Sequence, residues 1–467
     1  MSIDLISIMF LIHTILLGFI GFILLLKYWE WLPVFFLPLI WYLPAWTTPG
    51  GPMEHIRIVR WFMSLIVPLL GIIQLGRNIK FRQQLDLTPI ALPLITFVLV
   101  VILSTMINNS GFLNMIGYFS LFLQYPLFFM VLMNIKLPDR IIAWFIGLFL
   151  FLIFIQVPEI IFRYLMFGIT GDTISFTLGI WGAYNIGIFS LYAIALITAH
   201  GLVTRFRLLH LLAYLLLLIC ALIGEIKVVV VGAPLIVMAV VLVFLYKRFS
   251  QGLDISIYIK KFICGIIILA LLLPIYKNWG KVQSNNSLNK FSEDIYTIIS
   301  GTKPLTKREI YSINRFGILI EVFDFLKKKP LNLLFGLGPG SSFAGNFFSS
   351  RGKLLSLLNL PKWMVLPQIP SVLTDIGIVG LIIHLWIFTI LLKYLLVANQ
   401  KAQSIFYESL LLGSFGVWVF YVIVGPIYNI VWRTDCASYI FYFFMAVACK
   451  QAMKGHSDQE PGQEKLI

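Results

Sequence analysis

Apolar blocks about 16–28 residues long fill most of this chain, and their length limits its fold more than any other feature. A helix needs about 20 apolar residues to cross a hydrocarbon core about 30 Å thick, so each block matches one crossing. Charged residues make up 12% of the 467 residues, about half of the share that a soluble domain carries. The sequence therefore predicts an all-α protein, a polytopic transmembrane helix bundle of about 12–13 spans.

The blocks give thirteen predicted spans. They cover residues 4–28, 32–46, 56–76, 88–107, 112–134, 140–167, 183–203, 206–223, 229–247, 259–277, 371–394, 405–427 and 433–450. These spans divide the chain into a first helical part over residues 1–277, a long loop over 278–370, a second helical part over 371–450 and a polar tail over 451–467. All four cysteines lie in apolar blocks or at their edges, so we expect neither a disulfide framework nor a cysteine metal site.

Basic residues cluster in six of the short connections between spans. The clusters are Arg77, Lys80 and Arg82; Lys136 and Arg140; Arg205 and Arg207; Lys247, Arg248, Lys260 and Lys261; Lys393 and Lys401; and Lys450 and Lys454. All six fall on one side of the membrane when the thirteen spans are threaded in order, and the positive-inside rule makes that side cytoplasmic. The long loop is then extracytoplasmic and the tail is cytoplasmic.

The long loop over residues 278–370 carries twelve basic residues against five acidic ones. Long loops do not follow the positive-inside rule, so this positive charge is available for a ligand. Two interpretations stay open: a solvated basic surface near anionic lipid head groups, and a site for an anionic substrate.

The loop is predicted to be partly helical. Thr306-Lys-Arg-Glu309 has the form of a capping box, and apolar residues at helical spacing extend the helix to Lys329, just before Pro330. This predicts about six turns lying along the outer membrane face. Three glycines in Leu334-Phe-Gly-Leu-Gly-Pro-Gly340 permit a tight turn whose backbone N–H groups face an anion, although a simple chain reversal explains the same glycines. A second short helix is predicted around Leu354–Leu360.

Several motifs follow one another in a fixed order. Gly171-Asp-Thr-Ile-Ser-Phe-Thr-Leu-Gly179 is followed by Tyr184-Asn185 at the entry to a span. Arg315 and the glycine-rich turn come next, and Pro370-Ser-Val-Leu-Thr-Asp-Ile-Gly-Ile-Val-Gly380 stands where the chain re-enters the bilayer. With one long external loop late in the chain, this order resembles the bacterial O-antigen polymerase and O-antigen ligase superfamily, over about residues 165–385.

The resemblance implies a reaction and a place in the cell. Members of the superfamily lie in the bacterial inner membrane and transfer a glycan from an undecaprenyl-diphosphate carrier to an acceptor in lipopolysaccharide, capsule or exopolysaccharide synthesis. The ligases carry a functional His shortly before the re-entry motif. Here residues 361–376 contain no His and the nearest, His384, lies inside a span, so the resemblance favours a Wzy-type polymerase. It implies no cofactor, and a chain-length regulator protein is a possible partner.

Fixed cations are the predicted catalytic groups. The chain has no Asp-x-Asp pair for a metal, so Arg and Lys must stabilise the departing diphosphate. The candidate catalytic residues are Arg315, Lys227 and Glu225. The candidate residues for binding the diphosphate or glycan are Arg308, Arg163, Asp172, Tyr184, Gly338, Gly340 and Asp375. The superfamily has an Arg where this chain has Lys227, and Lys lacks the planar two-point grip of a guanidinium.

Simpler interpretations of these residues also stay open. Arg163 follows Glu159 by four positions, which is the spacing of an intrahelical ion pair. Asp375 lies near the predicted start of a helix, where it would serve as a cap. The general base is not assigned. The alternative functions are an O-antigen ligase and a flippase for the lipid-linked glycan, and the absence of an internal repeat argues against the flippase.

Overall fold

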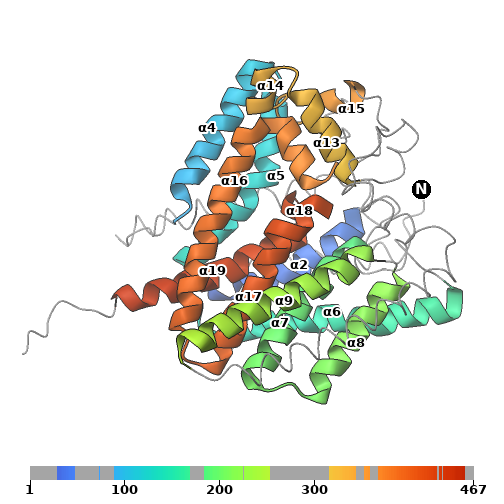
Figure 1. The fold of residues 1–467 in the computed structure, drawn as a ribbon, viewed down its shortest axis with the longest axis vertical. Helices are drawn as coiled ribbons and strands as arrows, with labels where there is room; N and C mark the ends of the chain where they lie inside the picture. The colour runs from blue at the N-terminus through green and yellow to red at the C-terminus, as the bar shows by residue number, and fades with distance from the viewer. Residues whose placement is uncertain are drawn as a thin grey trace, which may run out of the picture.

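The computed structural model describes residues 29–47, 73, 89–168, 183–224, 226–252, 315–342, 352–357, 366–428, 431–433 and 435–457 (Figure 1). Every regular element in these residues is helical, which confirms the predicted all-α class. The elements are η1 (Trp29–Trp31), α2 (Leu32–Thr47), α4 (Ala91–Asn108), α5 (Phe112–Asn134), α6 (Asp139–Phe167), α7 (Ala183–Thr204), α8 (Leu208–Ile223), α9 (Lys227–Ser250), α13 (Arg315–Leu326), α14 (Pro330–Phe335), α15 (Lys353–Leu357), α16 (Gln368–Lys401), α17 (Ile405–Val419), the π-helical turn η3 (Phe420–Val424), α18 (Gly425–Tyr428), η4 (Val431–Arg433) and α19 (Asp435–Ser457).

Seven helices in the described part are long and apolar enough to cross a membrane, and they make the chain a multi-pass membrane protein. They are α4, α5, α6, α7, α9, α16 and the continuous helical segment from α17 through η3 to Ile427. The predicted span 112–134 coincides with α5, and the predicted spans 140–167 and 183–203 differ from α6 and α7 by one residue at one end. The predicted spans 4–28 and 259–277, and all of the predicted span 56–76 except residue 73, lie outside the described residues.

The centre of the bundle is formed by α7 and α17, with α9 packed against both. Small residues bring α17 close to α7. A Cβ added to Gly413 would lie 2.8 Å from Cδ2 of Leu196, and one added to Gly416 would lie 2.7 Å from Cβ of Ala195. Helices in lipid associate mainly through close van der Waals packing, which favours small residues where their backbones approach.

A second group of helices surrounds α16, which packs against α4 and α19, while α19 packs against α5. Stacked aromatic rings fill the contacts of α19. The ring centroids of Phe145 and Phe443 are 3.6 Å apart, and those of Tyr421 and Phe441 are 3.9 Å apart. Pairs of aromatic rings add to the energy of burial, so these rings hold α6 and η3 against α19.

One backbone break divides α16. Gly377 has φ 69° and ψ −167°, far from helical values and in a region that suits glycine. Residues 378–401 beyond the break extend about 36 Å at 1.5 Å per residue, which is enough to cross a hydrocarbon core. The first part, residues 368–376, is therefore free to belong to a separate assembly.

That assembly contains α13, α14, α15 and the first part of α16. The three short helices lie together in the upper part of Figure 1. Their shared core consists of Ile318, Val322, Leu326, Leu337, Leu354, Leu366 and Leu373. We call this region, with the turn Gly336–Ser342, the glycine-loop end of the molecule.

The helices of the predicted loop differ in detail from the sequence expectations. The helix predicted over residues 306–329 is described from Arg315 and ends at Leu326. Pro330 begins the next helix, α14, at its first position, where the missing N–H of proline has no helical partner to lose. The short helix predicted around residues 354–360 is present as α15. The placement of the long loop on the extracytoplasmic side remains a prediction.

Lysine side chains link neighbouring helices at the end of the bundle that lies away from the glycine-loop end. Lys247 of α9 donates to the carbonyl of Ala402 at 3.3 Å, just after α16 ends. Lys401 donates to the carbonyl of Ala452 at 2.9 Å, and Lys450 of α19 donates to the carbonyl at the end of α5. Each ammonium group thus meets carbonyls at or near the negative end of another helix, which is the favourable arrangement for a helix dipole. We call this region the lysine end.

Candidate functional site

The candidate site is built on the turn Gly336–Ser342, which the sequence predicted as a tight glycine-rich turn. Gly336, Gly338 and Gly340 have φ values of 72°, 98° and 83°. These values lie in the left-handed region that side chains with a Cβ rarely adopt, so the alternation of glycine is required by the path of the chain. The turn joins the end of α14 to Ser342 at the glycine-loop end.

Two glycines let the turn and α16 cross at van der Waals contact. A Cβ added to Gly336 would lie 2.6 Å from the carbonyl oxygen of Thr374, and one added to Gly377 would lie 2.2 Å from the carbonyl oxygen of Leu334. The break in α16 also frees carbonyl groups from the helical pattern, and the N–H of Leu337 donates to the carbonyl of Thr374 at 2.7 Å. The glycines of two distant motifs therefore fit against each other.

Asp375 stabilises this crossing by joining α16 to the end of the turn. Its side chain is fully buried, and its two carboxylate oxygens accept hydrogen bonds from the backbone N–H of Ser342 at 2.8 Å and from the Ser342 hydroxyl at 2.6 Å. Ser104 of α4, also fully buried, contacts the carbonyls of Phe335 and Asp375 at 2.6 Å and 3.1 Å. Asp375, Gly338 and Gly340, which were three of the predicted binding residues, thus belong to one junction.

Some backbone N–H groups of the turn form hydrogen bonds within the junction, and others have no acceptor in the described residues. The N–H of Ser341 donates to the carbonyl of Gly338 at 3.2 Å, and the N–H groups of Leu337 and Ser342 are paired as described. Within the described residues no acceptor pairs with the N–H of Gly338 or of Gly340. Gly338 is buried and Gly340 is partly exposed. A buried backbone N–H without a partner is rare, so the N–H of Gly338 in particular is available to a ligand, and the N–H of Gly340 lies two residues further along the same turn.

A lysine lies beside the same turn. Gly338 approaches the connection between α4 and α5 so closely that an added Cβ would meet the Cβ atoms of Asn108 at 3.0 Å and Ser110 at 2.6 Å. The ammonium of Lys353 donates to the carbonyl of Asn108 at 2.7 Å. Lys353 is exposed, so two of its three protons remain free to meet an anion near Gly338.

The predicted cationic residues lie elsewhere or are only partly described. Arg315 is the first residue of α13 and Lys227 is the first residue of α9, and the structure describes their backbones but not their side chains. Tyr184 is likewise described only by its backbone, as the second residue of α7. Arg308, Asp172 and Glu225 lie outside the described residues. Their roles stay predictions.

Arg163 adopts the simpler of its two predicted arrangements. Its Nε atom lies 3.3 Å from Oε1 of Glu159, one helical turn earlier on α6, and both side chains are about a quarter exposed at 24% and 23%. An ion pair at this spacing stabilises a helix modestly. Nothing in this contact brings Arg163 to the glycine-loop end.

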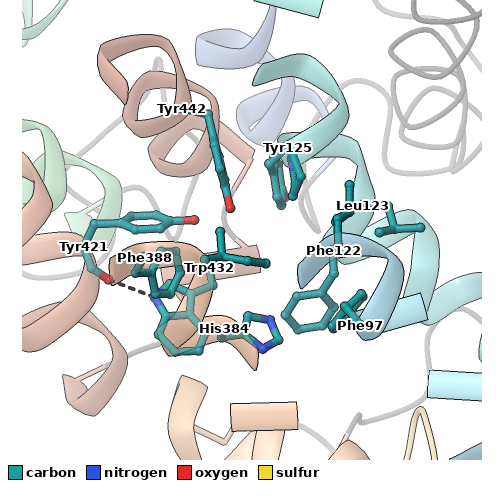
Figure 2. Close-up of a pocket in the computed structure, with 12 residues that line it drawn as sticks. Phe97, Phe122, Leu123, Tyr125, His384, Phe388, Tyr421, Trp432 and Tyr442 are labelled. Carbon is teal, nitrogen blue, oxygen red and sulfur yellow. Dashed lines mark hydrogen bonds between the residues drawn. The ribbon is translucent and has the colours of Figure 1, made fainter. Parts of the chain in front are cut away.

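His384 lies in a chamber of aromatic rings inside the bundle (Figure 2). It stacks on Trp432 with centroids 5.1 Å apart, while Phe97 and Phe122 meet it edge to face. Its Nδ1 atom lies 2.8 Å from the carbonyl of Gly380. The adjacent cavity offers only about 20 Å³ to the centres of water molecules, room for about one or two waters. This is the packing of a buried hydrogen-bonding residue.

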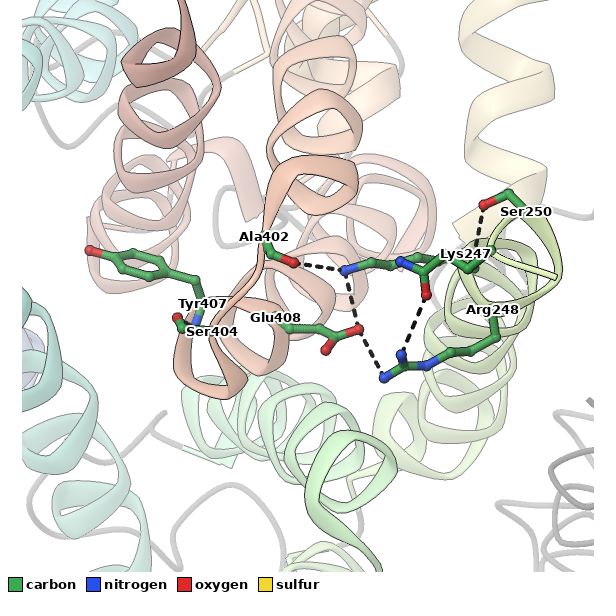
Figure 3. Close-up of polar contacts among 8 residues, drawn as sticks. Lys247, Arg248, Ser250, Ala402, Ser404, Tyr407 and Glu408 are labelled. Carbon is green, nitrogen blue, oxygen red and sulfur yellow. Dashed lines mark hydrogen bonds and ion pairs between the residues drawn. The ribbon is translucent and has the colours of Figure 1, made fainter. Parts of the chain in front are cut away.

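A cluster of charges at the lysine end is a contact that the sequence did not predict (Figure 3). Glu408 of α17 lies 3.1 Å from Nζ of Lys247 and 3.1 Å from a guanidinium nitrogen of Arg248. These lysine and arginine residues were interpreted only as a topology signal. Their ion pairs join α9 to α17 and leave little free charge for a substrate.

Ser342, Ser104 and Lys353 are members of the junction that sequence reasoning missed. Ser342 directly follows the glycine-rich turn, and that position was an available signal. Ser104 stands inside an apolar block, and no local pattern distinguishes it from a serine that bonds its own helix. No family model and no curated protein matches this sequence.

Proposed function

We propose that this protein is a membrane glycan polymerase that transfers an undecaprenyl-diphosphate-linked oligosaccharide onto another lipid-linked repeat unit. One observation carries the proposal most strongly. The glycine-rich turn and the re-entry motif, two of the features on which the superfamily resemblance depends, meet through Leu337–Thr374 and Ser342–Asp375. The residues in these two contacts are more than thirty positions apart in the sequence. Their contact supports the proposal that the two motifs form one site.

The proposed reaction requires positive charge beside the diphosphate, which is the leaving group. A hydroxyl of the acceptor sugar attacks the anomeric carbon, the bond from that carbon to the diphosphate oxygen breaks, and the hydroxyl proton leaves to a base or to water. The negative charge that develops on the diphosphate is stabilised by fixed donors. Arg315 and Lys227 are our candidates for this role, with Lys353 and the N–H groups of Gly338 and Gly340 as further donors at the glycine-loop end.

Asp375 has a positioning role in this proposal. Both of its oxygens are bound to Ser342, so the carboxylate is engaged in holding the turn. A base for the acceptor hydroxyl would need a free oxygen lone pair facing the substrate. The proposed place of the enzyme is the bacterial inner membrane, with the glycine-loop end on the extracytoplasmic side, where lipid-linked repeat units are joined.

The test uses purified protein in lipid vesicles with the lipid-linked repeat unit as the only glycan. We expect the wild-type protein to produce a ladder of longer glycans, and Arg315→Ala to reduce elongation at least about a hundredfold while the protein stays inserted. Arg140→Ala is the matched control, because Arg140 is an exposed arginine at the first turn of α6.

Other outcomes would contradict the proposal. An unchanged ladder in Arg315→Ala would remove Arg315 from the reaction. Glycan transferred only to a lipid A core would indicate a ligase. Intact substrate that moves to the other leaflet without growing would indicate a flippase.

A further inference from the structure

Gln368, the first residue of α16, carries a buried amide that the junction does not use. Its side chain is 0% exposed, and neither its oxygen nor its nitrogen has a hydrogen-bond partner in the described part of the chain. Leaving buried donors and acceptors unpaired is unfavourable, because each group loses its hydrogen bonds to water and gains none in return. A residue that tolerates this cost is a candidate for binding something from outside the chain.

The other buried amides in the described residues behave differently. Gln124 accepts from the Tyr439 hydroxyl at 3.1 Å, and Gln156 donates to the carbonyl of Leu152 at 3.2 Å. Asn185 and Asn399 each have one fully buried side-chain atom without a partner, the oxygen. Within the described chain Gln368 is therefore the one side-chain amide whose oxygen and nitrogen are both fully buried and unpaired.

The position of Gln368 on α16 links it to the candidate site. Gln368 and Asp375 are seven residues apart, so in helical projection they point within about 20° of each other and lie about 10 Å apart along the axis. Ser371 lies on the same side, and all three side chains are buried at 0–1% exposure. Leu373, on the opposite side of the helix, packs into the small core of the glycine-loop end.

This face of α16 leads from the junction toward the start of the helix. Asp375 binds Ser342 at the end of the glycine-rich turn, and α13, which begins at Arg315, packs against α16 and α18. A ligand held near the turn would reach Gln368 by extending about two helical turns along α16. The spacing suits a diphosphate at one end of the site and a sugar at the other.

We propose that Gln368 binds a hydroxyl or acetamido group of the glycan and so contributes to the recognition of the sugar. The inference rests on the proposed function. An amide is neutral and offers both donors and an acceptor, which matches a sugar hydroxyl that also donates and accepts. A diphosphate, in contrast, is held by cations and N–H groups. Gln368 therefore recognises the glycan and not its carrier.

The test compares the binding of two carriers to the full-length protein in detergent. One is the lipid-linked repeat unit purified from host cells that lack this protein, and the other is the same carrier diphosphate after the glycan has been removed. We expect the wild-type protein to bind the glycan-bearing carrier more tightly. Gln368→Met keeps the length of the side chain, and we expect it to weaken binding of that carrier about tenfold and leave the bare carrier unchanged.

Stability supplies a second readout. Met removes the unpaired groups, so Gln368→Met without carrier should unfold at the same temperature as the wild type or at a higher one. Asn399→Leu is the matched control, because Asn399 is a buried amide near the far end of the same helix, and we expect it to change neither carrier's affinity. If Gln368→Met does not fold, Gln368→Asn retracts the amide by one carbon and should weaken glycan binding in the same way.

Three results would overturn the inference. An unchanged preference for the glycan-bearing carrier in Gln368→Met would show that the amide does not contact the sugar, and the proposed function would stand. Equal weakening of the binding of both carriers would show that Gln368 stabilises the structure of the site and does not contact the sugar. Failure of the wild-type protein to bind either carrier would reject the proposed function as well.

Discussion

The glycine-loop end and the lysine end of the molecule satisfy their buried polar groups in opposite ways. At the lysine end, Glu408 faces two cations, and lysine ammonium groups reach the carbonyls of other helices. At the glycine-loop end, the Asp375 carboxylate accepts hydrogen bonds from Ser342, and Gln368 has no partner in the described residues. The described polar groups at the lysine end are joined mainly by ion pairs. Those at the glycine-loop end are joined by hydrogen bonds to backbone and hydroxyl groups, and the Gln368 amide has no partner there.

The difference teaches where to look for function in a chain of this class. Charged residues at the lysine end are consumed by contacts between helices, so their number says little about a ligand. Among the described residues, the glycine-loop end leaves both ends of the Gln368 amide unpaired, and a buried polar group without a partner indicates a binding site. Three substitutions test this contrast.

The largest effect is expected from Gly377→Ala. A Cβ at this position would lie 2.2 Å from the carbonyl oxygen of Leu334 in a backbone conformation with φ 69°. Strain of this kind alone is worth about 1–3 kcal/mol, and the clash adds to it, so we expect more than about 3 kcal/mol of lost stability in thermal unfolding.

Gly147→Ala is the control for this glycine. An added Cβ at Gly147 in α6 meets nothing within 4 Å, so this variant should unfold at or slightly above the wild-type temperature. Equal stability of the two variants would mean that the crossing of the turn and α16 is loose.

A smaller effect is expected from Glu408→Gln at the lysine end. The variant leaves Lys247, with 5% of its side chain exposed, without its carboxylate, while Arg248 at 20% exposure keeps some contact with water. We expect a loss of about 2–3 kcal/mol in thermal unfolding, below the range for a fully buried pair. Adding Lys247→Met to this variant should restore part of the loss. No recovery in the double variant would show that the ion pair is not what stabilises this end.

The smallest effect is expected from Glu321→Gln in α13. Burial raises the pKa of the Glu321 carboxyl above its ordinary value, and no cation pairs with it among the described residues. The folded chain therefore holds this proton more tightly than the unfolded chain, and stability falls as pH rises from the ordinary carboxyl range through the raised pKa. Glu321→Gln should gain less than about 0.5 kcal/mol at neutral pH and lose this pH dependence. A loss as large as that of Glu408→Gln would erase the contrast between the ends.

Much of the fold follows from block length. The boundaries of α5 and α6 agree with the predicted spans within one residue, because turns with Gly, Asn or Pro interrupt otherwise continuous apolar sequence. The break at Gly377 was not predicted. Its neighbours are apolar on both sides, and only the contacts of Leu334 with Gly377 and of Leu337 with Thr374 explain why the helix opens there.

The candidate site was less predictable than the fold. Asp375 and the glycine-rich turn were named from the resemblance, but their mutual contact depends on a crossing between segments that are remote in sequence. Gln368 was missed because glutamine at the start of a helix is ordinary in sequence. Only its burial and its unpaired amide make it unusual.

The lysine contacts have a consequence for any attempt to re-orient this protein in the membrane. Lys247, Lys401 and Lys450 are among the charges that set the predicted topology, and each also fastens its own helix to a neighbour. On the predicted topology, relocating them would alter the direction of insertion, and it would also remove these contacts between helices. The residues that are predicted to direct insertion are therefore also residues that hold the folded helices together.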